Sequence, residues 1–391
     1  MKLVPLGDIC HIRIGRTPSR ANPDYWSGPI PWATIADLGE GPLTVTRDWI
    51  TDLAVREARM PVVPPGTLLY SFKLTIGKMA ITGTSLYTNE AIAALVPRDP
   101  SNLDRDYLRY ALASIDGGAD SSMAVKGRTL NSETLAKLSI PIIPVDDQRH
   151  IASNLTSQLE AVHKTRDLTR ARLETSTRVR EKVVDGAFDP LSGDRHQPLG
   201  KTGSLVDGDW ILNADYSPSG VRLFQVGDVG RRRLLAKSNR HISLDRAQEL
   251  KCTFLRPGDV LISRMPDPIG RACQIPDLEY PAITAVDVTI FRPDASKVAT
   301  EFVVQFMNSQ SWHRAAAAQA SGATRARISR RNLEGLEIPL PALDVQRRIG
   351  ADLHERHKAM DAVDAALTEE LKALDALPDA LLRHAFREVA V

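Results

Sequence analysis

Residues 342–391 carry the most regular hydrophobic pattern of the chain. One apolar side chain recurs at every seventh position: Leu353, Met360, Leu367, Leu374 and Leu381. A second, interrupted stripe lies four residues earlier in the heptad: Ile349, Val363 and Leu377. A seven-residue repeat is typical of a helix that packs along another helix in a coiled coil. The segment is therefore predicted to form a long helix, which Pro378 should end or kink near its last turns.

Residues 144–188 repeat this pattern in a weaker form. Apolar positions keep the spacing near both ends of the segment: Ile151, Leu155, Val162, Val179 and Val183. Thr169 and Ser176 interrupt it in the middle. Asp146 stands near the start of this segment, as Asp344 does in the later one, and a carboxylate in the first turn offsets the helix dipole. The sequence thus predicts two long helices that pack on each other.

The two helical segments belong to an internal repeat with a register of 198 residues. Residues 135–155 and 333–353 align without a gap, and nine of their 21 paired residues are identical. Farther upstream, residues 65–71 (PGTLLYS) align with residues 257–263 (PGDVLIS) at an offset of 192. The C-terminal parts of the two repeats are alike, whereas the parts that precede them differ. This indicates one scaffold that carries two different domains.

The segments before the tails, residues 1–143 and 201–341, have the mixed pattern of α+β domains. Short apolar runs bounded by turn residues predict strands in the first segment: residues 66–72, 78–82 and 91–97. Residues 107–115 have helical spacing. The same pattern returns in the second segment: residues 259–264, 288–293 and 302–310. The two domains are therefore predicted to share one topology.

The length of the connector between the halves constrains how the helices pack. Residues 189–200 are rich in proline and glycine, and this linker can span at most about 40 Å. A helix over residues 146–188 would be about 65 Å long. The second domain must then begin near the far end of the first helix, so the second helix can bury its seam only by running back. The predicted fold is two similar α+β domains joined by two long antiparallel coiled-coil helices, with a pseudo-twofold internal repeat.

Composition limits the class of protein. Hydrophobic residues make up 43% of the chain and charged residues 25%, which is typical of a globular protein. No apolar run reaches 18 residues, so no membrane span is expected, and the first residues lack the apolar stretch of a signal peptide. Cys10, Cys252 and Cys273 are widely spaced and odd in number, which favours a reducing cytoplasm. The net charge is only +2, but arginines gather in the domains and acidic residues in the second tail.

The sequence contains no constellation that would make the chain an enzyme. Gly200-Lys201-Thr202 has Arg195 where an ATP-binding loop needs its first glycine. The tetrapeptide Asn213-Ala214-Asp215-Tyr216 lacks the paired prolines of amino-methyltransferases. The histidines show no spacing suited to a metal. We therefore expect no catalytic residue, no metal site and no cofactor bound by this chain.

Several segments together resemble the specificity subunit of type I restriction–modification systems. The resemblance lies in these segments: GRTPSRANPDYWSGPIPWATIADL (15–38), PPGTLLYSF (64–72), IGK (76–78), IPIIPVDDQRHI (140–151) and the AF pairs at 187–188 and 385–386. The order of two domains and two helices fits the same family. Residues 207–220 depart from the pattern of the first domain, which suggests a different recognition subtype in the second.

The resemblance implies a function for each part of the chain. The domains, residues 1–143 and 201–341, would be target-recognition domains, and residues 144–188 and 342–391 would be spacer helices. Members of the family bind double-stranded DNA, carry no catalytic residues and dock modification (methyltransferase) subunits, here expected to be two, together with restriction subunits that translocate DNA. S-adenosylmethionine, ATP and Mg²⁺ would bind to those partner subunits. The helix seam expected to hold the assembly comprises Ile151, Leu155, Val162, Ile349, Leu353, Met360, Leu367 and Leu374.

Basic side chains at equivalent places in the two repeats are candidates for DNA contact. Lys73 and Lys78 flank a strand-to-strand loop in the first half, as Arg264 and Arg271 do in the second. A positive charge at the same place in two repeats that otherwise differ favours a contact with a DNA phosphate or base. The alternative is a charged hairpin without a ligand.

Four further segments offer side chains to DNA, all of them basic except Thr17. The residues concerned are Arg16 and Thr17 in the first turn, Lys126 and Arg128 before the first helical tail, Arg325, Arg327 and Arg330 at the equivalent place in the second half, and Arg231 and Arg232 in a run of three arginines. Arginine can grip guanine or phosphate in a bidentate manner. The alternatives are a solvated entry turn, a solvated helix start and a hairpin rim. Trp26 and Trp32 are expected in the core rather than stacked on bases.

Taken together, these patterns predict a non-catalytic DNA-recognition subunit that acts in the cytoplasm. Two readers held at a fixed separation would examine two half-sites about one helical turn apart, roughly 34–36 Å, with an unread spacer between them. One alternative is an independent nuclease or methyltransferase, which the missing motifs oppose. The other is a coiled-coil scaffold or DNA-binding protein without sequence reading, which the arginine clusters and the divergence of the two halves oppose.

Overall fold

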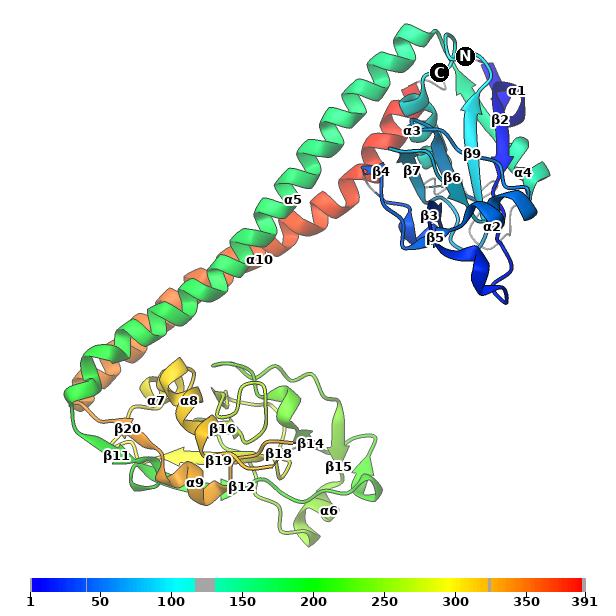
Figure 1. Ribbon diagram of the computed structural model, residues 1–391. Helices are drawn as coiled ribbons and strands as arrows, with labels where there is room; N and C mark the ends of the chain where they lie inside the picture. The colour runs from blue at the N-terminus through cyan, green and yellow to red at the C-terminus, as the bar shows by residue number, and fades with distance from the viewer. Residues whose placement is uncertain (1, 40, 117–130, 323–324, 389–391) are drawn as a thin grey trace. The chain divides into compact units, whose positions relative to one another are not determined.

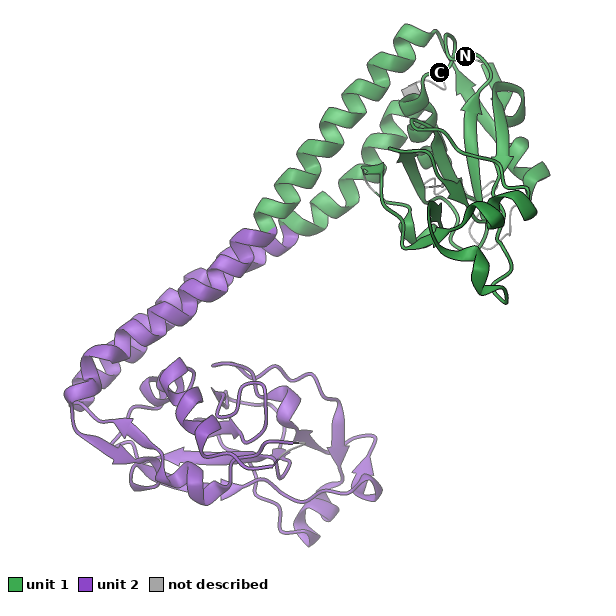
Figure 2. Cartoon of the chain, viewed as in Figure 1, with its two compact units in different colours: residues 1–169, 370–391 green, residues 170–369 purple. Residues whose placement is uncertain are grey.

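The structure is a computed structural model that describes residues 2–39, 41–116, 131–322 and 325–388. The chain divides into two compact units: Met1–Thr169 with Glu370–Val391, and Arg170–Glu369 (Figure 2). Two long helices, α5 (Val145–Phe188) and α10 (Leu343–Glu388), cross the boundary between the units (Figure 1). Each unit therefore combines one α+β domain with one part of each long helix.

The first unit is built on two small sheets and the strand pair that carries the chain into α5. The main sheet has the order β2 (Cys10–Ile14), β9 (Ile92–Pro97), β6 (Leu68–Ser71), β7 (Met79–Thr82), β4 (Pro42–Leu43). The second sheet has the order β5 (Asp48–Ile50), β3 (Trp26–Ala33), β8 (Tyr87–Thr88), and β1 (Lys2–Pro5) pairs with β10 (Ser139–Ile142). The short helices are α1 (Leu6–Ile9), α2 (Asp52–Glu57), α3 (Arg105–Asp116) and α4 (Ser132–Ala136).

The second unit repeats this plan with one strand fewer in its main sheet and one strand more in its second sheet. Its main sheet has the order β12 (Gly203–Asp207), β19 (Val288–Pro293), β16 (Val260–Ser263), β17 (Ala272–Gln274). Its second sheet has the order β13 (Tyr216–Ser217), β15 (Arg240–Ile242), β14 (Val221–Phe224), β18 (Ala282–Thr284), and β11 (His196–Pro198) pairs with β20 (Glu337–Pro339). The short helices are α6 (Leu244–Glu249), α7 (Thr300–Phe306), α8 (Gln310–Ala318) and α9 (Arg330–Gly335).

Strand directions confirm the predicted internal repeat. β3 pairs antiparallel with β5 and parallel with β8, and β14 pairs in the same two ways with β15 and β18. The shared Pro-Gly turn before β6 and β16 also has a physical reason. Gly66 and Gly258 have φ values of 77° and 89°, a left-handed backbone that glycine adopts without steric cost. The connector of residues 189–200 contains β11, so it belongs to the sheet structure of the second unit.

Buried glutamines fasten each long helix to its own domain. Gln148 accepts a hydrogen bond from the Asp104 amide at 2.9 Å, and its amide donates to the carbonyls of Asn102 and Ile143. Gln346 accepts from the Ala299 amide at 2.9 Å and donates to the carbonyls of Lys297 and Pro341. Both side chains are fully buried. The same three-bond lock therefore sets the start of α5 and of α10, which explains why this glutamine survives in both repeats.

Within each unit the two long helices run antiparallel, as predicted. In the first unit Arg166 lies 4.0 Å from Asp375, and Thr169 donates to Glu370. The residue numbers of the contacts therefore fall along α10 as they rise along α5. In the second unit Arg180 pairs with Asp361 and Asp364, both at 2.7 Å. Polar side chains thus occupy a large part of the helix contact.

The predicted seam is correct for one stripe of α10 and displaced by one residue for the other. The predicted seam positions in the two helices are buried or half-buried: Ile151, Leu155, Val162, Ile349, Leu353, Met360, Leu367 and Leu374. Val363 and Leu377 are instead exposed, by 54% and 38%, and Val179 is exposed as well. The second stripe that is turned inward consists of His357, Asp364, Leu371, Pro378 and Ala385. The second stripe was predicted from apolar residues alone. The side chains of α5 that face this part of α10 are polar, so they require polar partners.

Pro378 was expected to end or kink the second helix, and it does not end it, because α10 continues through this proline to Glu388. The turns beyond it are held by packing. Leu381, Leu382, Ala385 and Phe386 lie against the core of the first unit, and the Phe386 ring is 5.4 Å from the ring of Tyr107. This burial offsets the one backbone hydrogen bond that a proline removes.

Candidate nucleic-acid interface

The first candidate surface is the loop of residues 15–22, which follows β2. Gly15 fixes its start, because a Cβ atom there would lie 2.1 Å from the carbonyl oxygen of Thr88. The amide of Arg16 then donates to the same carbonyl at 2.8 Å. The turn that sequence analysis selected is therefore tied to the end of β8 and not freely solvated.

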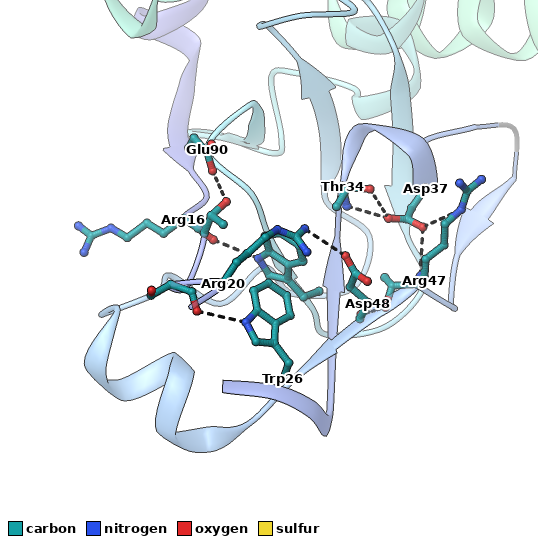
Figure 3. Close-up of polar contacts among 12 residues, drawn as sticks. Arg16, Arg20, Trp26, Thr34, Asp37, Arg47, Asp48 and Glu90 are labelled. Atoms are coloured by element: carbon teal, nitrogen blue, oxygen red, sulfur yellow. Dashed lines mark hydrogen bonds and ion pairs between the residues drawn. The ribbon is translucent and has the colours of Figure 1, made fainter. Parts of the chain in front are cut away.

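Two indole rings hold the other side of this loop. Trp32 is buried and donates from Nε1 to the carbonyl of Arg16 at 3.0 Å. Trp26 is half-buried and donates to the carbonyl of Ser19 at 3.2 Å (Figure 3). Their rings meet edge to face with centroids 5.2 Å apart. Trp32 is thus a core residue, while Trp26 forms the floor beneath the loop.

Arg20 covers this floor and was missed by sequence analysis. Its guanidinium carbon lies 4.7 Å from the ring centroid of Trp26 and 5.8 Å from that of Trp32, and Nη2 lies 3.5 Å from Asp48 Oδ2 (Figure 3). An arginine stacked on an aromatic face keeps most of its donors free for a ligand. The signal was present in the sequence, since Arg20 stands between the Arg16 turn and the first tryptophan.

The predicted residues Arg16 and Thr17 lie at the rim of this floor. The Arg16 side chain is exposed and donates from Nη1 to the carbonyl of Ala58 at 2.9 Å. Thr17 donates to Glu90, and this hydrogen bond is the main reason why the pKa of Glu90 is lowered. Lys73 adds positive charge near the same carboxylate. The surface therefore presents cations around one ionised carboxylate.

The loop between β6 and β7 extends this basic surface. Lys73 is half-buried, with Nζ 5.4 Å from the ring centroid of Phe72, and Lys78 is exposed. Leu74 between them is 90% exposed and has a φ of 60°. The structure thus leaves both lysines and an apolar loop tip accessible.

The equivalent arginines of the second unit do not lie at the surface. Arg271 is buried and donates to the carbonyls of Val226, Val229, Met265 and Pro268. Arg264 is also buried, pairs with Asp207 at 3.2 Å and donates to the carbonyl of Val286. Here the structure differs from the predicted DNA contact. These guanidinium groups satisfy carbonyls that the surrounding loops leave without strand partners.

The arginines after residue 324 form the basic surface of the second unit instead. Arg325 is exposed, Arg327 lies 3.2 Å from Asp287, and Arg330 lies 3.2 Å from Glu334 and 3.8 Å from Asp207. Arg325 has no ion pair among the described residues. The predicted residues Lys126 and Arg128 of the first half lie outside the described residues.

The run of residues 231–233 lies apart from that surface, beside α10. Arg231 pairs with Glu181 of α5 at 3.0 Å, and Arg232 donates to His357 of α10. Burial lowers the pKa of Arg232 to about 10, and the nearby positive charge of Arg180 adds to this effect. Arg233 is exposed. This run therefore faces the long helices.

The titratable groups do not form a reactive centre in the part of the chain that the structure describes. Burial raises the pKa of the Cys10 and Cys273 thiols to about 12 and that of Cys252 to about 11, so all three remain protonated. No group of three or more histidine, cysteine or acidic residues suited to a metal occurs among the described residues. Within the same residues, no helix is long and apolar enough to cross a membrane.

Two histidines should make the second unit sensitive to acid. Burial lowers the pKa of His313 to about 4 and that of His357 to about 3, whereas both titrate near 6.5 in an unfolded chain. The unfolded chain therefore takes up protons that the folded chain refuses, and the stability falls as the pH drops from about 6.5 towards 4. We expect His357→Gln, which still offers an acceptor to Arg232, to make this loss shallower in urea titrations at several pH values. Superimposable pH curves for both proteins would contradict this assignment.

Comparison with known proteins finds similarity in sequence for part of the chain. Residues 1–173 match the model of the type I restriction modification DNA specificity domain. The chain is 31% identical over 161 residues to the specificity subunit of the type I restriction enzyme MjaIX from Methanocaldococcus jannaschii, which covers 38% of this chain and 35% of that protein. It is 24% identical over 160 residues to the EcoR124I/EcoR124II specificity subunit from Escherichia coli, covering 38% and 39% of the two chains. The chain thus spans little more than a third of the length of these curated relatives.

Solved structures extend the similarity in fold to nearly the whole chain. A chain solved in a study of complex assembly and conformational transition of the type I R-M system has a TM-score of 0.75 at 18% identity, with 98% of this chain and 97% of that chain covered. The HsdS subunit from Thermoanaerobacter tengcongensis has a TM-score of 0.64 at 18% identity, with 99% and 96% covered. Residues 1–173 therefore match a type I restriction modification DNA specificity domain, and nearly the whole chain shares its fold with these solved structures.

Proposed function

We propose that the chain reads a bipartite sequence on double-stranded DNA with its two domains and directs modification and restriction subunits to that site. The proposal is based mainly on one observation. The two domains share a topology and are fastened to the long helices by the same glutamine hydrogen bonds, but they differ in the surfaces that could meet DNA. The glutamine locks are the same in both units. The basic surfaces are not, since the first uses Arg16, Arg20 and Lys73 and the second uses Arg325 and its neighbours.

The long helices would set the distance between the two half-sites. α5 has 44 residues, which corresponds to about 66 Å at 1.5 Å per residue. This length exceeds one turn of DNA, about 34–36 Å, the separation at which two readers meet the same face of a duplex. The helices would also dock the methyltransferase subunits. S-adenosylmethionine, ATP and Mg²⁺ would be bound by those partners, and the assembly would act on cytoplasmic DNA.

The exchange of one domain tests the proposed reading directly. If residues 201–341 are replaced by the corresponding domain of another specificity subunit, one half of the methylated sequence should change and the other half should stay. Mapping methylated positions in a host genome that carries the partner subunits measures this outcome. The matched control exchanges residues 1–143 and should change the other half only. A change in both halves after either exchange would contradict modular reading, and unchanged methylation would favour a scaffold without sequence reading.

Arginines at the two kinds of site should respond differently to substitution. Arg325→Gln removes one exposed cation, so we expect weaker duplex binding and a slope of log K against log salt that is smaller by about 0.9. Arg271→Gln removes four hydrogen bonds to carbonyls, so we expect it to lower stability instead. Arg348→Gln, an exposed charge change on α10, is the control for both. An unchanged salt slope for Arg325→Gln would remove this residue from the interface.

A further inference from the structure

A cavity of about 330 Å³ lies inside the second unit, where α10 meets the domain. The turn of residues 231–233 lines one side, and Gln305 of α7 and His357 and Lys358 of α10 line another. Its volume is at the lower end of the range for small-molecule sites. None of the described residues that line it is phenylalanine, tyrosine or tryptophan. The volume of the cavity suits a small ligand.

The lining carries more positive than negative charge that is free to act on a ligand. Its two carboxylates are already engaged, since Asp361 pairs with Arg180 at 2.7 Å and Glu301 lies 2.6 Å from His354. Arg231 is paired with Glu181. Among the described residues, no carboxylate lies within ion-pair distance of Arg232, Arg233 or Lys358. Three cations therefore face the cavity without an anion of their own.

His357 adds a hydrogen-bond donor without an acceptor. Its side chain is 4% exposed, and its Nε2 lies 2.9 Å from Arg232 Nη1. A guanidinium group can only donate, so Nε2 accepts and the proton of the neutral ring must be on Nδ1. The low pKa of this histidine, about 3, keeps the ring neutral at physiological pH. Nδ1 is buried and has no partner, and a buried N–H group without an acceptor costs about 1–3 kcal/mol.

Gln305 has a hydrogen-bond acceptor without a donor. It is also 4% exposed, and its Oε1 is buried without a donor. The wall of the cavity thus holds one donor without an acceptor and one acceptor without a donor, beside three cations that have no ion pair. Both wall atoms have almost no accessible surface, so a ligand reaches them only when the two side chains turn towards the cavity. A singly protonated oxyanion such as hydrogen phosphate would then satisfy all of these groups, because its bare oxygens accept and its hydroxyl donates.

The backbone of Arg232 supports a role beyond packing. Its φ is 69°, in the left-handed region where a side chain other than glycine, asparagine or aspartate is uncommon. Its amide donates to the carbonyl of Ala272 at 2.7 Å, which holds the residue in this conformation. Non-glycine residues kept in such a conformation cluster at ligand sites. Here the strain presents a guanidinium group to the cavity.

We propose that this cavity binds a free oxyanion of the phosphate class, held by Arg232, Arg233 and Lys358 together with His357 and Gln305. The bound anion would bridge the domain and α10, because its partners come from both. It would therefore stabilise the joint between the second domain and its helix. This site is separate from the exposed surface around Arg325 and does not depend on the reading of DNA.

Thermal unfolding of the full-length chain in inorganic phosphate tests the proposal, with sodium chloride adjusted to keep the ionic strength constant. We expect a saturable rise of the melting temperature, with a smaller effect of sulfate, which has no hydroxyl for Gln305 at neutral pH. Lys358→Gln and Arg233→Gln should each weaken the apparent affinity for phosphate about tenfold, as expected for the loss of one charge-assisted contact. Both residues are exposed, so the variants should fold. Arg348→Gln, on the same helix but outside the cavity, should bind phosphate like the parent chain.

Three results would overturn the proposal. The first is a melting temperature that does not saturate with phosphate, and the second is an equal response to sulfate and phosphate. The third is that the cavity binds a phosphate group of the DNA backbone instead of a free anion. A short duplex without terminal phosphates tests this possibility. If Lys358→Gln weakens binding of that duplex while free phosphate has no saturable effect, the cavity holds a DNA phosphate and not a free anion.

Discussion

Gln346→Leu should lower the stability of the second unit by about 3–5 kcal/mol, because it removes a fully buried side chain that partners three partly buried backbone groups. Those groups are the amide of Ala299 and the carbonyls of Lys297 and Pro341, all within 3.2 Å of the glutamine side chain. Leucine has a similar volume but neither donates nor accepts. Hydrogen–deuterium exchange in α7 and in the first turns of α10 would measure the loss where it occurs.

The repeat supplies a second copy of the same experiment. Gln148→Leu should produce an equal loss in the first unit and leave exchange in α7 unchanged, since its partners are Asp104, Asn102 and Ile143. Gln158→Leu, at an exposed position of α5, is the matched control and should stay within about 0.5 kcal/mol of the parent chain. If Gln346→Leu were as stable as this control, the glutamine lock would not be what fixes α10 to its domain.

Leu353→Ala should destabilise the second unit by about 3 kcal/mol or more, because it opens a cavity in a closed core. Leu353 is 1% exposed and shares a cluster with Val184 and Phe188 of α5 and with Phe302 of the domain. The substitution therefore loosens α5, α10 and the domain at one point. Urea unfolding followed by the fluorescence of Trp312, which lies in the same cluster, would report this loss.

A leucine of the same helix pair provides the comparison. Leu168 on α5 is 53% exposed, so Leu168→Ala removes the same atoms with little change in burial and should cost less than about 0.5 kcal/mol. Equal losses for Leu353→Ala and Leu168→Ala would mean that the cluster around Leu353 does not hold the helices to the domain.

The features that could be predicted are those that a local pattern reports. The Pro-Gly turns before β6 and β16 need a left-handed backbone, so the same dipeptide appears in both halves. The stripe from Leu353 to Leu374 repeats because a helix buries every seventh residue. The antiparallel direction followed from the length of a linker against the length of a helix. Each of these is a constraint that the chain meets with residues close together in sequence.

The features that could not be predicted depend on groups that the sequence does not mark. Arg271 points inward and donates to four carbonyls from two separate loops, and no sequence pattern reports that these carbonyls come together. The second stripe of α10 contains Asp364, which pairs with Arg180 of α5, and His357, which accepts from Arg232 of the domain. Gln148 and Gln346 were visible as identical residues of the repeat, but their role needed the positions of their backbone partners.

The last turns of α10 complete the core of the first unit, and this has a consequence for how the protein is made. Phe386 and its neighbours can reach the Tyr107 core only after residues 170–369 of the second unit have been synthesised. Domains generally fold as they emerge, starting from the N-terminus. Here the first domain must wait for residues that are synthesised after the second domain, so a stop codon between the second domain and Leu381 would damage the first domain as well.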